Sequence, residues 1–185
     1  MDVVELTPGL HFLRFPIGHA YLLEHKGGLA LIDTSVPGSA SPIAAAIGAI
    51  GRDPADLRHL FLTHFHADHA GAAADIAAWG DVQVLAHRAD APFLRGDAAG
   101  PPPDLADWER PIFDQVTAWL PAVPVPPVRV DRELSDGDGL DFGDGAVLIA
   151  APGHTPGSAA VYLPRPRVLI AGDAMARRPD GQPMV

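Results

Sequence analysis

Short apolar runs, separated by glycine and proline, fill the first part of the chain. Three of them cover residues 9–15, 19–25 and 29–33, and the breaks between them are Pro16-Ile17-Gly18 and Lys26-Gly27-Gly28. Short runs bounded by such turn formers are typical of β-strands. The pattern therefore predicts three consecutive strands.

An alternation of helices and strands follows. We predict an alanine-rich helix over residues 41–50, with Ser41 as its N-cap and a proline at its first helical position. Buried strands are predicted at 58–62 and 82–86, with a helix at 70–79 between them. Strands that alternate with helices indicate a layered α/β domain.

A proline-rich stretch, residues 88–128, interrupts this alternation. Helical spacing of apolar residues predicts a helix over 111–120 within it. Two interpretations stay open for this helix: one face packs in the core, or the stretch forms a lid to which Trp108 and Phe113 supply substrate contacts. In either case we expect a single domain over residues 1–185, with this stretch as lid or insert.

The strand pattern resumes after the proline-rich stretch. Apolar runs at 147–150, 161–163 and 168–171 predict three further strands. The Asp-Gly pairs between residues 136 and 145 are interpreted as tight turns, because their spacing does not fit the calcium loop of an EF-hand. The second half therefore adds strands to the layered domain.

One run, residues 63–71, reads Thr-His-Phe-His-Ala-Asp-His-Ala-Gly and directly follows a predicted buried strand. His64, His66 and Asp68 alternate, so they would share one side if strand geometry continued, and His69 would turn the other way. Imidazoles and carboxylates are the ligands that zinc prefers when no thiolate is available. This run predicts a metal site where a strand ends and a helix begins.

Four motifs, in this order, resemble those of the metallo-β-lactamase-fold hydrolases, the family that includes glyoxalase II enzymes. They are the early strand ending in an aspartate (29–34), the histidine run (63–71), a second histidine loop (151–158) and a metal-bridging aspartate loop (169–173). The likeness covers nearly the whole chain. It implies an α/β fold of the αββα sandwich type.

The resemblance also implies a metal centre with one or two zinc ions, for which iron or manganese are alternatives. His64, His66 and His154 would hold the first ion. Three imidazoles and a water leave the open position that a hydrolytic zinc site requires.

The second ion would be held by Asp68 and His69, with Asp173 bridging the two ions. Two cations that share a hydroxide lower its pKa and polarise the scissile carbonyl. Asp68 would also orient this hydroxide and carry the proton afterwards, so it is the expected catalytic residue.

Three further residues are expected close to the metal ligands. Asp33 and Thr34 are interpreted as turn residues, or as residues that orient the metal-bound histidines, rather than as ligands. His19 lies in a loop where family members often have a polar residue near the pocket, and contact with the substrate or with a ligand remains open for it.

The chain departs from the family pattern after Asp173. Only 12 residues follow (185 minus 173), and none is a histidine. Relatives continue with further helices, a strand and a turn whose histidine completes the second metal site. We therefore expect a C-terminally incomplete sandwich with a weak second site, and a homodimer as one way to cover the apolar flank left on strand 168–171.

Composition narrows the classes of protein. There is no cysteine, which excludes disulfides and thiolate metal sites, and the net charge of −10 argues against a nucleic-acid partner. The acidic N-terminus does not resemble a signal peptide, and no apolar run reaches the roughly 18 residues of a membrane span. We expect a cytoplasmic protein that acts on a small molecule and binds neither nucleic acid nor membrane.

The leading hypothesis is a metal-dependent hydrolase that uses a metal-bound hydroxide on a small thioester, ester or lactone. A persulfide dioxygenase is an alternative, since those relatives hold one iron with residues that match His64, His154 and Asp173. A second alternative is a non-catalytic, truncated remnant that binds metal without turnover.

Overall fold

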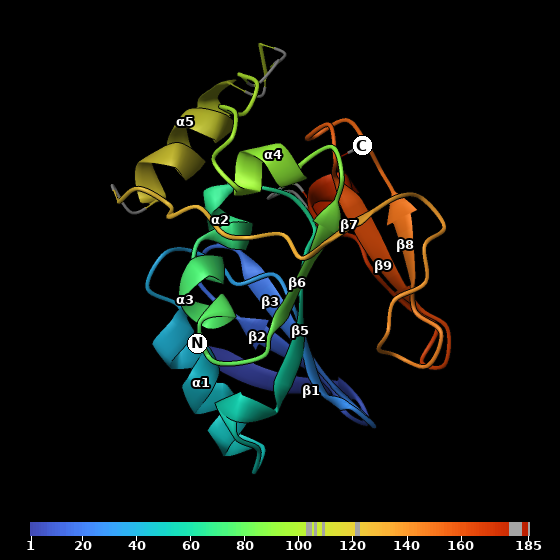
Figure 1. Cartoon of the computed structure of the whole chain (residues 1–185). Coiled ribbons are helices and arrows are strands. Elements are labelled where there is room, and N and C mark those ends of the chain that lie inside the picture. Colours follow the sequence, from blue (N-terminus) through green and yellow to red (C-terminus); the bar gives the residue numbers. More distant parts are fainter. Residues whose placement is uncertain (103–104, 106, 109, 121–122, 178–182, 185) are drawn as a thin grey trace.

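The computed structural model describes the whole chain except residues 103–104, 106, 109, 121–122, 178–182 and 185 (Figure 1). The strands are β1 (Asp2–Thr7), β2 (Leu10–Arg14), β3 (His19–His25), β4 (Gly28–Ile32), β5 (Leu57–Leu62), β6 (Gln83–His87), β7 (Arg132–Leu134), β8 (Val147–Ala150), β9 (Ala159–Leu163), β10 (Val168–Ile170), β11 (Ala176–Arg177) and β12 (Pro183–Met184). The helices are α1 (Ala40–Ala49), η1 (Pro54–Asp56), α2 (Ala67–Ala70), α3 (Ala73–Ala77), α4 (Ala91–Leu94), α5 (Arg110–Trp119) and η2 (Gly172–Ala174).

The larger sheet has the strand order β1-β2-β3-β4-β5-β6-β7. Its first four strands pair antiparallel through short turns, whereas β4, β5, β6 and β7 pair parallel. Parallel neighbours need crossover connections, and the helices supply them. Sequence reasoning missed β1, because its side chains are mostly exposed and show no apolar alternation.

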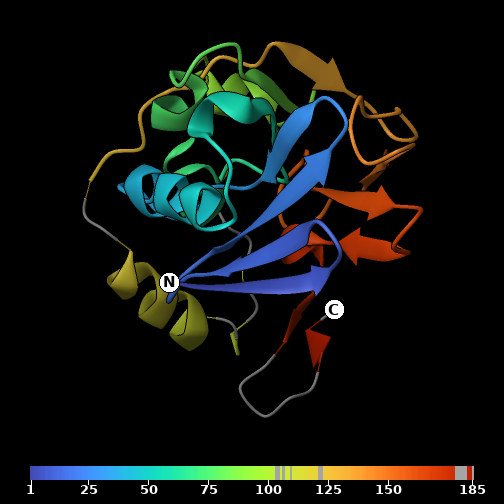
Figure 2. The ribbon, with the colours of Figure 1, turned by 90° about the horizontal axis from the view of Figure 1, so that it is seen from below.

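Alternating side chains of the central strands pack into two separate cores. Leu29, Leu31 and Leu60 pack with residues of α1 and α3 on one face, whereas Ile32 and Phe61 pack against the smaller sheet on the other. Figures 1 and 2 show the helices and the smaller sheet on opposite faces of the larger one. The described chain thus forms helix, sheet and sheet layers, in agreement with the expected α/β sandwich.

The smaller sheet has the order β10-β9-β8 and is antiparallel throughout. Its inner face contributes Leu148, Val161 and Ile170 to the core between the sheets. On its outer face Ile149 and Leu169 are 41% and 47% exposed. The predicted apolar flank is therefore present, and the homodimer stays a prediction.

Two predicted helices differ from those in the structure. The first begins at Ala40 rather than after Ser41, because the Ser39 carbonyl already accepts the first helical bond, from Ile43 N–H. The second, predicted over 70–79, is two short helices, α2 and α3, which a turn at Gly71 separates.

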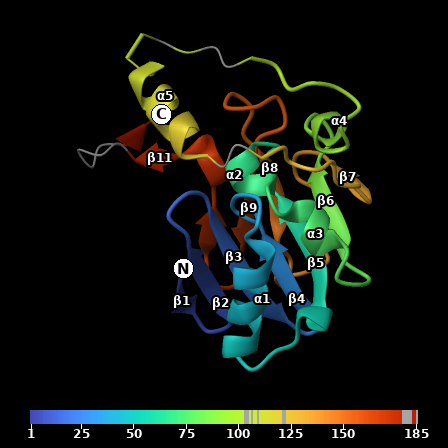
Figure 3. The same cartoon turned by 90° about the vertical axis from the view of Figure 1, so that its left-hand side faces the viewer.

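The proline-rich stretch carries α4 and α5, and Figure 3 shows α5 standing apart from α1 and α3. Phe113 on α5 and Trp108 before it are 40% and 52% exposed. The side chains of Ile112, Val116 and Trp119 lie outside the described residues, so the core-face interpretation of this helix stays a prediction. Within the described residues, no helix is long and apolar enough to cross a membrane.

Candidate metal centre

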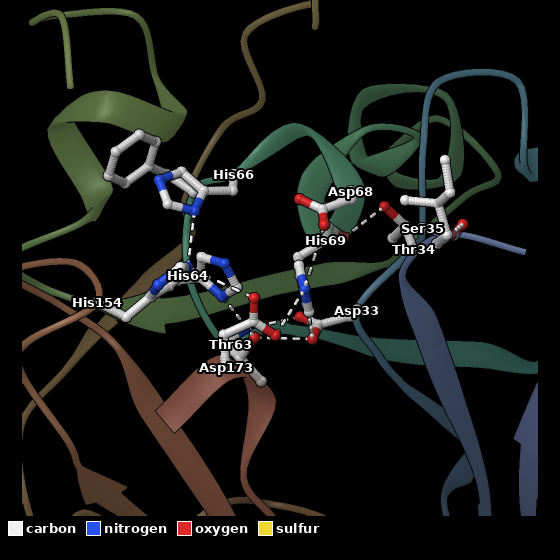
Figure 4. Close-up of polar contacts among 12 residues, drawn as sticks. Asp33, Thr34, Ser35, Thr63, His64, His66, Asp68, His69, His154 and Asp173 are labelled. Carbon is white, nitrogen blue, oxygen red and sulfur yellow. Dashed lines mark hydrogen bonds and ion pairs between the residues drawn. The ribbon is translucent and has the colours of Figure 1, made fainter. Parts of the chain in front are cut away.

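Strand ends from both sheets meet at one edge of the molecule. In the larger sheet the parallel strands β4, β5 and β6 end there, so Asp33, the histidine run and Asp90 come from adjacent loops. In the smaller sheet β8 and β10 both run antiparallel to β9, so His154 and Asp173 also follow strands that end on a common side. Figure 4 shows the side chains of His64, His66, His69, His154 and Asp173 gathered together.

Three histidines form the first group of candidate ligands. His64, His66 and His154 each place one ring nitrogen within 4.8 Å of the others. His66 Nδ1 and His154 Nε2 lie 2.9 Å apart. His64 is buried, His66 is partly buried and His154 is exposed, so the group opens toward solvent on one side.

The second group shares His64 and adds His69 and Asp173. His69 Nε2 lies 3.1 Å from Asp173 Oδ1, and Asp173 Oδ2 lies 3.5 Å from His154 Nε2. The two carboxylate oxygens therefore face one histidine of each group. The family resemblance implied a bridging role for this aspartate, and that role stays a prediction.

Asp68 belongs to neither group, although it is close to both. Its Oδ2 lies 3.9 Å from His69 Nε2. Strand geometry does not continue into the histidine run, because β5 ends at Leu62 and His66 is already the N-cap of α2. A turn followed by a helix, and not an extended strand, gathers these side chains.

The buried carboxylate of Asp33 contacts two residues of the histidine run, Thr63 and His69. It accepts hydrogen bonds from Thr63 N–H at 2.8 Å and from Thr63 Oγ1 at 2.7 Å, and its Oδ2 lies 2.8 Å from His69 Nδ1. Its backbone is left-handed, with φ of 60°. The geometry agrees with the expectation that Asp33 orients a ligand instead of acting as one, and Thr34 Oγ1 donates to the His69 carbonyl at 2.9 Å.

Burial and charge set the protonation of the site. Burial, followed by the charge of His69, lowers the pKa of His64 well below its usual value, and burial followed by His154 lowers the pKa of His66 to about 4. Both rings are therefore neutral near pH 7, with lone pairs available for a metal.

His69 and Asp173 behave differently. Burial favours the neutral ring of His69, but Asp33 and Asp173 outweigh it and hold its pKa well above the usual value. Burial likewise favours a neutral Asp173, but the hydrogen bond and charge of His69 outweigh it and hold the Asp173 pKa well below its usual range. These residues form a charged pair that a cation would have to reorganise.

The residues present fit a metal ion. The Nε2 atom of His64 is buried and has no hydrogen-bond partner among the described residues, whereas its Nδ1 lies 3.1 Å from Thr63 Oγ1. A buried lone pair without a partner is costly, and a cation would satisfy it. Imidazole nitrogens with carboxylate oxygens suit zinc, iron or manganese.

His19 opens β3, where its ring meets Phe12 edge-on at 4.9 Å. Burial, followed by the charge of His69, lowers the pKa of His19. It therefore lies within electrostatic reach of the centre, and its role stays a prediction.

Sequence reasoning missed Asp90, a buried carboxylate that contacts both histidine loops. Burial raises its pKa, and hydrogen bonds from Thr155, Gly157 and Phe65 oppose this effect. The available signal was an acidic residue three positions after β6, in the loop at the same edge of the sheet as Asp33 after β4.

Comparison with known proteins agrees with this geometry. The Metallo-beta-lactamase superfamily matches residues 13–185. The chain is 29% identical to the probable metallo-hydrolase YflN of Bacillus subtilis over 92% of this chain and 66% of the relative. It is 30% identical to a hydroxyacylglutathione hydrolase of Acidiphilium cryptum, over 90% of this chain and 54% of that protein.

A solved structure of a metallo-β-lactamase has a similar fold. BJP-1, a subclass B3 metallo-β-lactamase of Bradyrhizobium japonicum, superposes with a TM-score of 0.71 at 27% identity, over 87% of this chain and 56% of that one. The fold is that of the metallo-β-lactamases among the solved structures. The chain belongs to the metallo-β-lactamase superfamily, and it spans less than two thirds of the length of the relatives described above.

Proposed function

We propose that this protein is a zinc-dependent hydrolase of a small thioester, ester or lactone. The observation that carries the proposal is the convergence of two ligand groups on His64, at an edge where strands of both sheets end. The relatives named metallo-hydrolase and hydroxyacylglutathione hydrolase support the reaction class.

The two groups would bind separate cations. His64, His66 and His154 would hold one cation, and His69 with Asp173 would hold a second. Cations held there would lower the pKa of a bound water and polarise the carbonyl under attack, so no side-chain nucleophile is needed.

Asp68 is the proposed proton carrier. Its side chain is 19% exposed and lies 3.9 Å from His69 Nε2, outside the hydrogen-bond network of Asp33. A carboxylate so placed can orient the attacking water, accept its proton and pass the proton to the leaving group. Trp108 and Phe113 are exposed on the proline-rich stretch and are proposed substrate contacts.

Metal content and turnover of the same preparation test the proposal. The full chain, purified without chelator, should contain zinc and hydrolyse at least one of a glutathione thioester, an aryl ester and a γ-lactone. His66→Ala should remove most of the metal and lower turnover at least about tenfold. His25→Ala is the matched control, because His25 lies at the far end of β3 from the site, and it should keep both.

Three outcomes would contradict the proposal. Equal metal content in both variants would show that the histidine run is not the site. Bound iron, with oxygen consumption on a persulfide of glutathione, would favour the dioxygenase. Bound metal without turnover of any of the substrates would favour a metal-binding protein that is not a hydrolase.

A further inference from the structure

We infer that Asp90 is a positioning residue that fixes the distance between the His66 loop and the His154 loop. Its Oδ2 accepts hydrogen bonds from Phe65 N–H at 3.1 Å and from Thr155 Oγ1 at 2.7 Å. Its Oδ1 accepts one from Gly157 N–H at 2.6 Å. One carboxylate thus joins loops that belong to different sheets.

The Asp90 side chain does not cap its own helix. It occupies the N-cap position of α4, where an aspartate ordinarily accepts a hydrogen bond from the first turn, yet its side chain makes no such bond. The carboxylate is instead 1% exposed and directed at the two loops. Capping of α4 therefore does not explain an aspartate here.

The His154 loop is shaped to meet this carboxylate. A Cβ atom added at Gly157 would lie 2.7 Å from Asp90 Oδ1, closer than real Cβ contacts allow. The loop is also tied internally, since Thr155 N–H donates to Ser158 Oγ at 2.9 Å. Only a residue without a side chain lets the backbone come this near.

Two of the three hydrogen bonds come from residues adjacent to candidate ligands, one in each loop. Phe65 lies between His64 and His66 in sequence, and Thr155 directly follows His154. The facing ring nitrogens of His66 and His154 are 2.9 Å apart. Asp90 holds the Phe65 backbone in one loop and the Thr155 hydroxyl and Gly157 backbone in the other. It therefore sets how far these two rings can separate.

The negative charge is essential to this role. All three partners are donors, and an ionised carboxylate is a pure acceptor. An asparagine would turn an N–H₂ group toward at least one donor and lose a charge-assisted bond. The inference rests on the proposed function in one respect, namely that the two loops hold a metal.

Cobalt binding by Asp90→Asn tests the inference. We expect the Co²⁺ affinity, measured by competition with a chelator, to fall at least about tenfold, the usual effect of losing a residue that orients ligands. The visible spectrum of bound Co²⁺ should change as well. Asp131→Asn is the matched control, since Asp131 Oδ2 also accepts a backbone N–H, from Val84 at 2.8 Å, away from the site. It should bind Co²⁺ within about twofold of the unmodified chain.

A readout without metal separates positioning from general stability. In the metal-free protein, the NMR cross-peak between the His66 and His154 rings should weaken in Asp90→Asn and persist in Asp131→Asn, at equal folded fraction by urea unfolding. Thr155→Val removes one of the three bonds and covers the case in which Asp90→Asn does not fold. We expect an intermediate loss of Co²⁺ affinity in this variant, and Thr155→Ser should restore it.

Unchanged Co²⁺ affinity and spectrum in Asp90→Asn, or in Thr155→Val where the former does not fold, would overturn the inference. So would a loss fully explained by a smaller folded fraction. His66→Ala distinguishes this failure from that of the metal centre. If that variant loses Co²⁺ while Asp90→Asn keeps it, only the role of Asp90 is wrong.

Discussion

His69 is the histidine of the centre that two carboxylates hold at once. Its Nδ1 faces Asp33 at 2.8 Å and its Nε2 faces Asp173 at 3.1 Å. A carboxylate on one ring nitrogen fixes the ring and makes the other nitrogen a stronger ligand. The ring can then bind a cation through Nε2 once its proton has left.

Asp173→Asn should lower turnover at least about tenfold and weaken bound metal, because a neutral amide is a poorer ligand than a carboxylate. The same change removes one of the two carboxylates that raise the pKa of His69. Elemental analysis and steady-state kinetics on one preparation check both effects. Normal turnover would mean that Asp173 is a turn residue only.

The family resemblance supplied the expected ligands of the centre but not all of the residues that support them. Five of the six expected ligands fall in the two groups, and Asp68 lies beside His69. All six lie in segments that follow strand ends, and the periodic pattern predicts those strands. Asp90 contacts loops that are 25 and 65 residues away along the chain. An acidic residue after a strand is a weak signal of such a support, but only the packed fold shows which loops it contacts.

Among the helices, the break between α2 and α3 shows how packing overrides local pattern. The alanine-rich run favours one continuous helix. Gly71 instead lies against Pro37, and a Cβ atom there would overlap the Pro37 backbone nitrogen. Its N–H donates to the Ser35 carbonyl at 3.0 Å, which ties the turn to the loop after β4. The sequence shows Gly71 but not that Pro37 packs against it in the fold.

Two glycine substitutions should therefore change stability in opposite directions. Gly71→Ala should destabilise the fold by about 1–3 kcal/mol through overpacking. Gly48→Ala should stabilise it by roughly 0.5–1 kcal/mol, because Gly48 is on α1 with open space around it. Urea unfolding of the two variants measures both changes. Equal effects would contradict the close contact at Gly71.

At the scale of the whole molecule, a second group of histidines, partly buried, lies toward the start of β5, away from the centre. The rings of His25 and His59 lie 5.3 Å apart, and each is within 6.4 Å of Phe142. Burial lowers the pKa of both histidines. The buried His25 Nε2 and His59 Nδ1 have no hydrogen-bond partner among the described residues.

This group predicts a loss of stability in acid. Above the unfolded pKa of about 6.5, both states carry neutral rings and the group contributes no pH dependence. Below it the unfolded chain takes up protons more readily than the folded one, so the free energy of unfolding falls as pH falls. His59→Phe keeps a ring in place and should reduce that fall.

Urea unfolding of the metal-free protein at pH 8 and pH 5 measures the effect. The comparison at pH 8 gives the packing cost of His59→Phe, since neither state is protonated there. The further change at pH 5 isolates the contribution of the proton. An equal pH 8-to-pH 5 loss in both proteins would show that His59 does not titrate between the folded and unfolded states.

The layered fold was predictable because its strands and crossovers follow local periodicity. The meeting of the two sheets was not derivable from that pattern, and it entered through the family resemblance alone. It depends on long-range contacts, such as the bond from Ala159 N–H to the Thr63 carbonyl at 2.9 Å. That bond connects the start of β9 to the histidine run.

Asp33 and Ser35 have left-handed backbones, with φ of 60° and 59°. This geometry restricts which residue types can occupy the two positions. Glycine and asparagine adopt such angles most readily, so a saturation library should retain both at position 35. Position 33 must combine the same angle with a carboxylate that accepts from Thr63 and faces His69. Aspartate alone meets both demands. Variants of this fold selected for new substrates must therefore keep aspartate at position 33, whereas the residues of the surrounding loops can change.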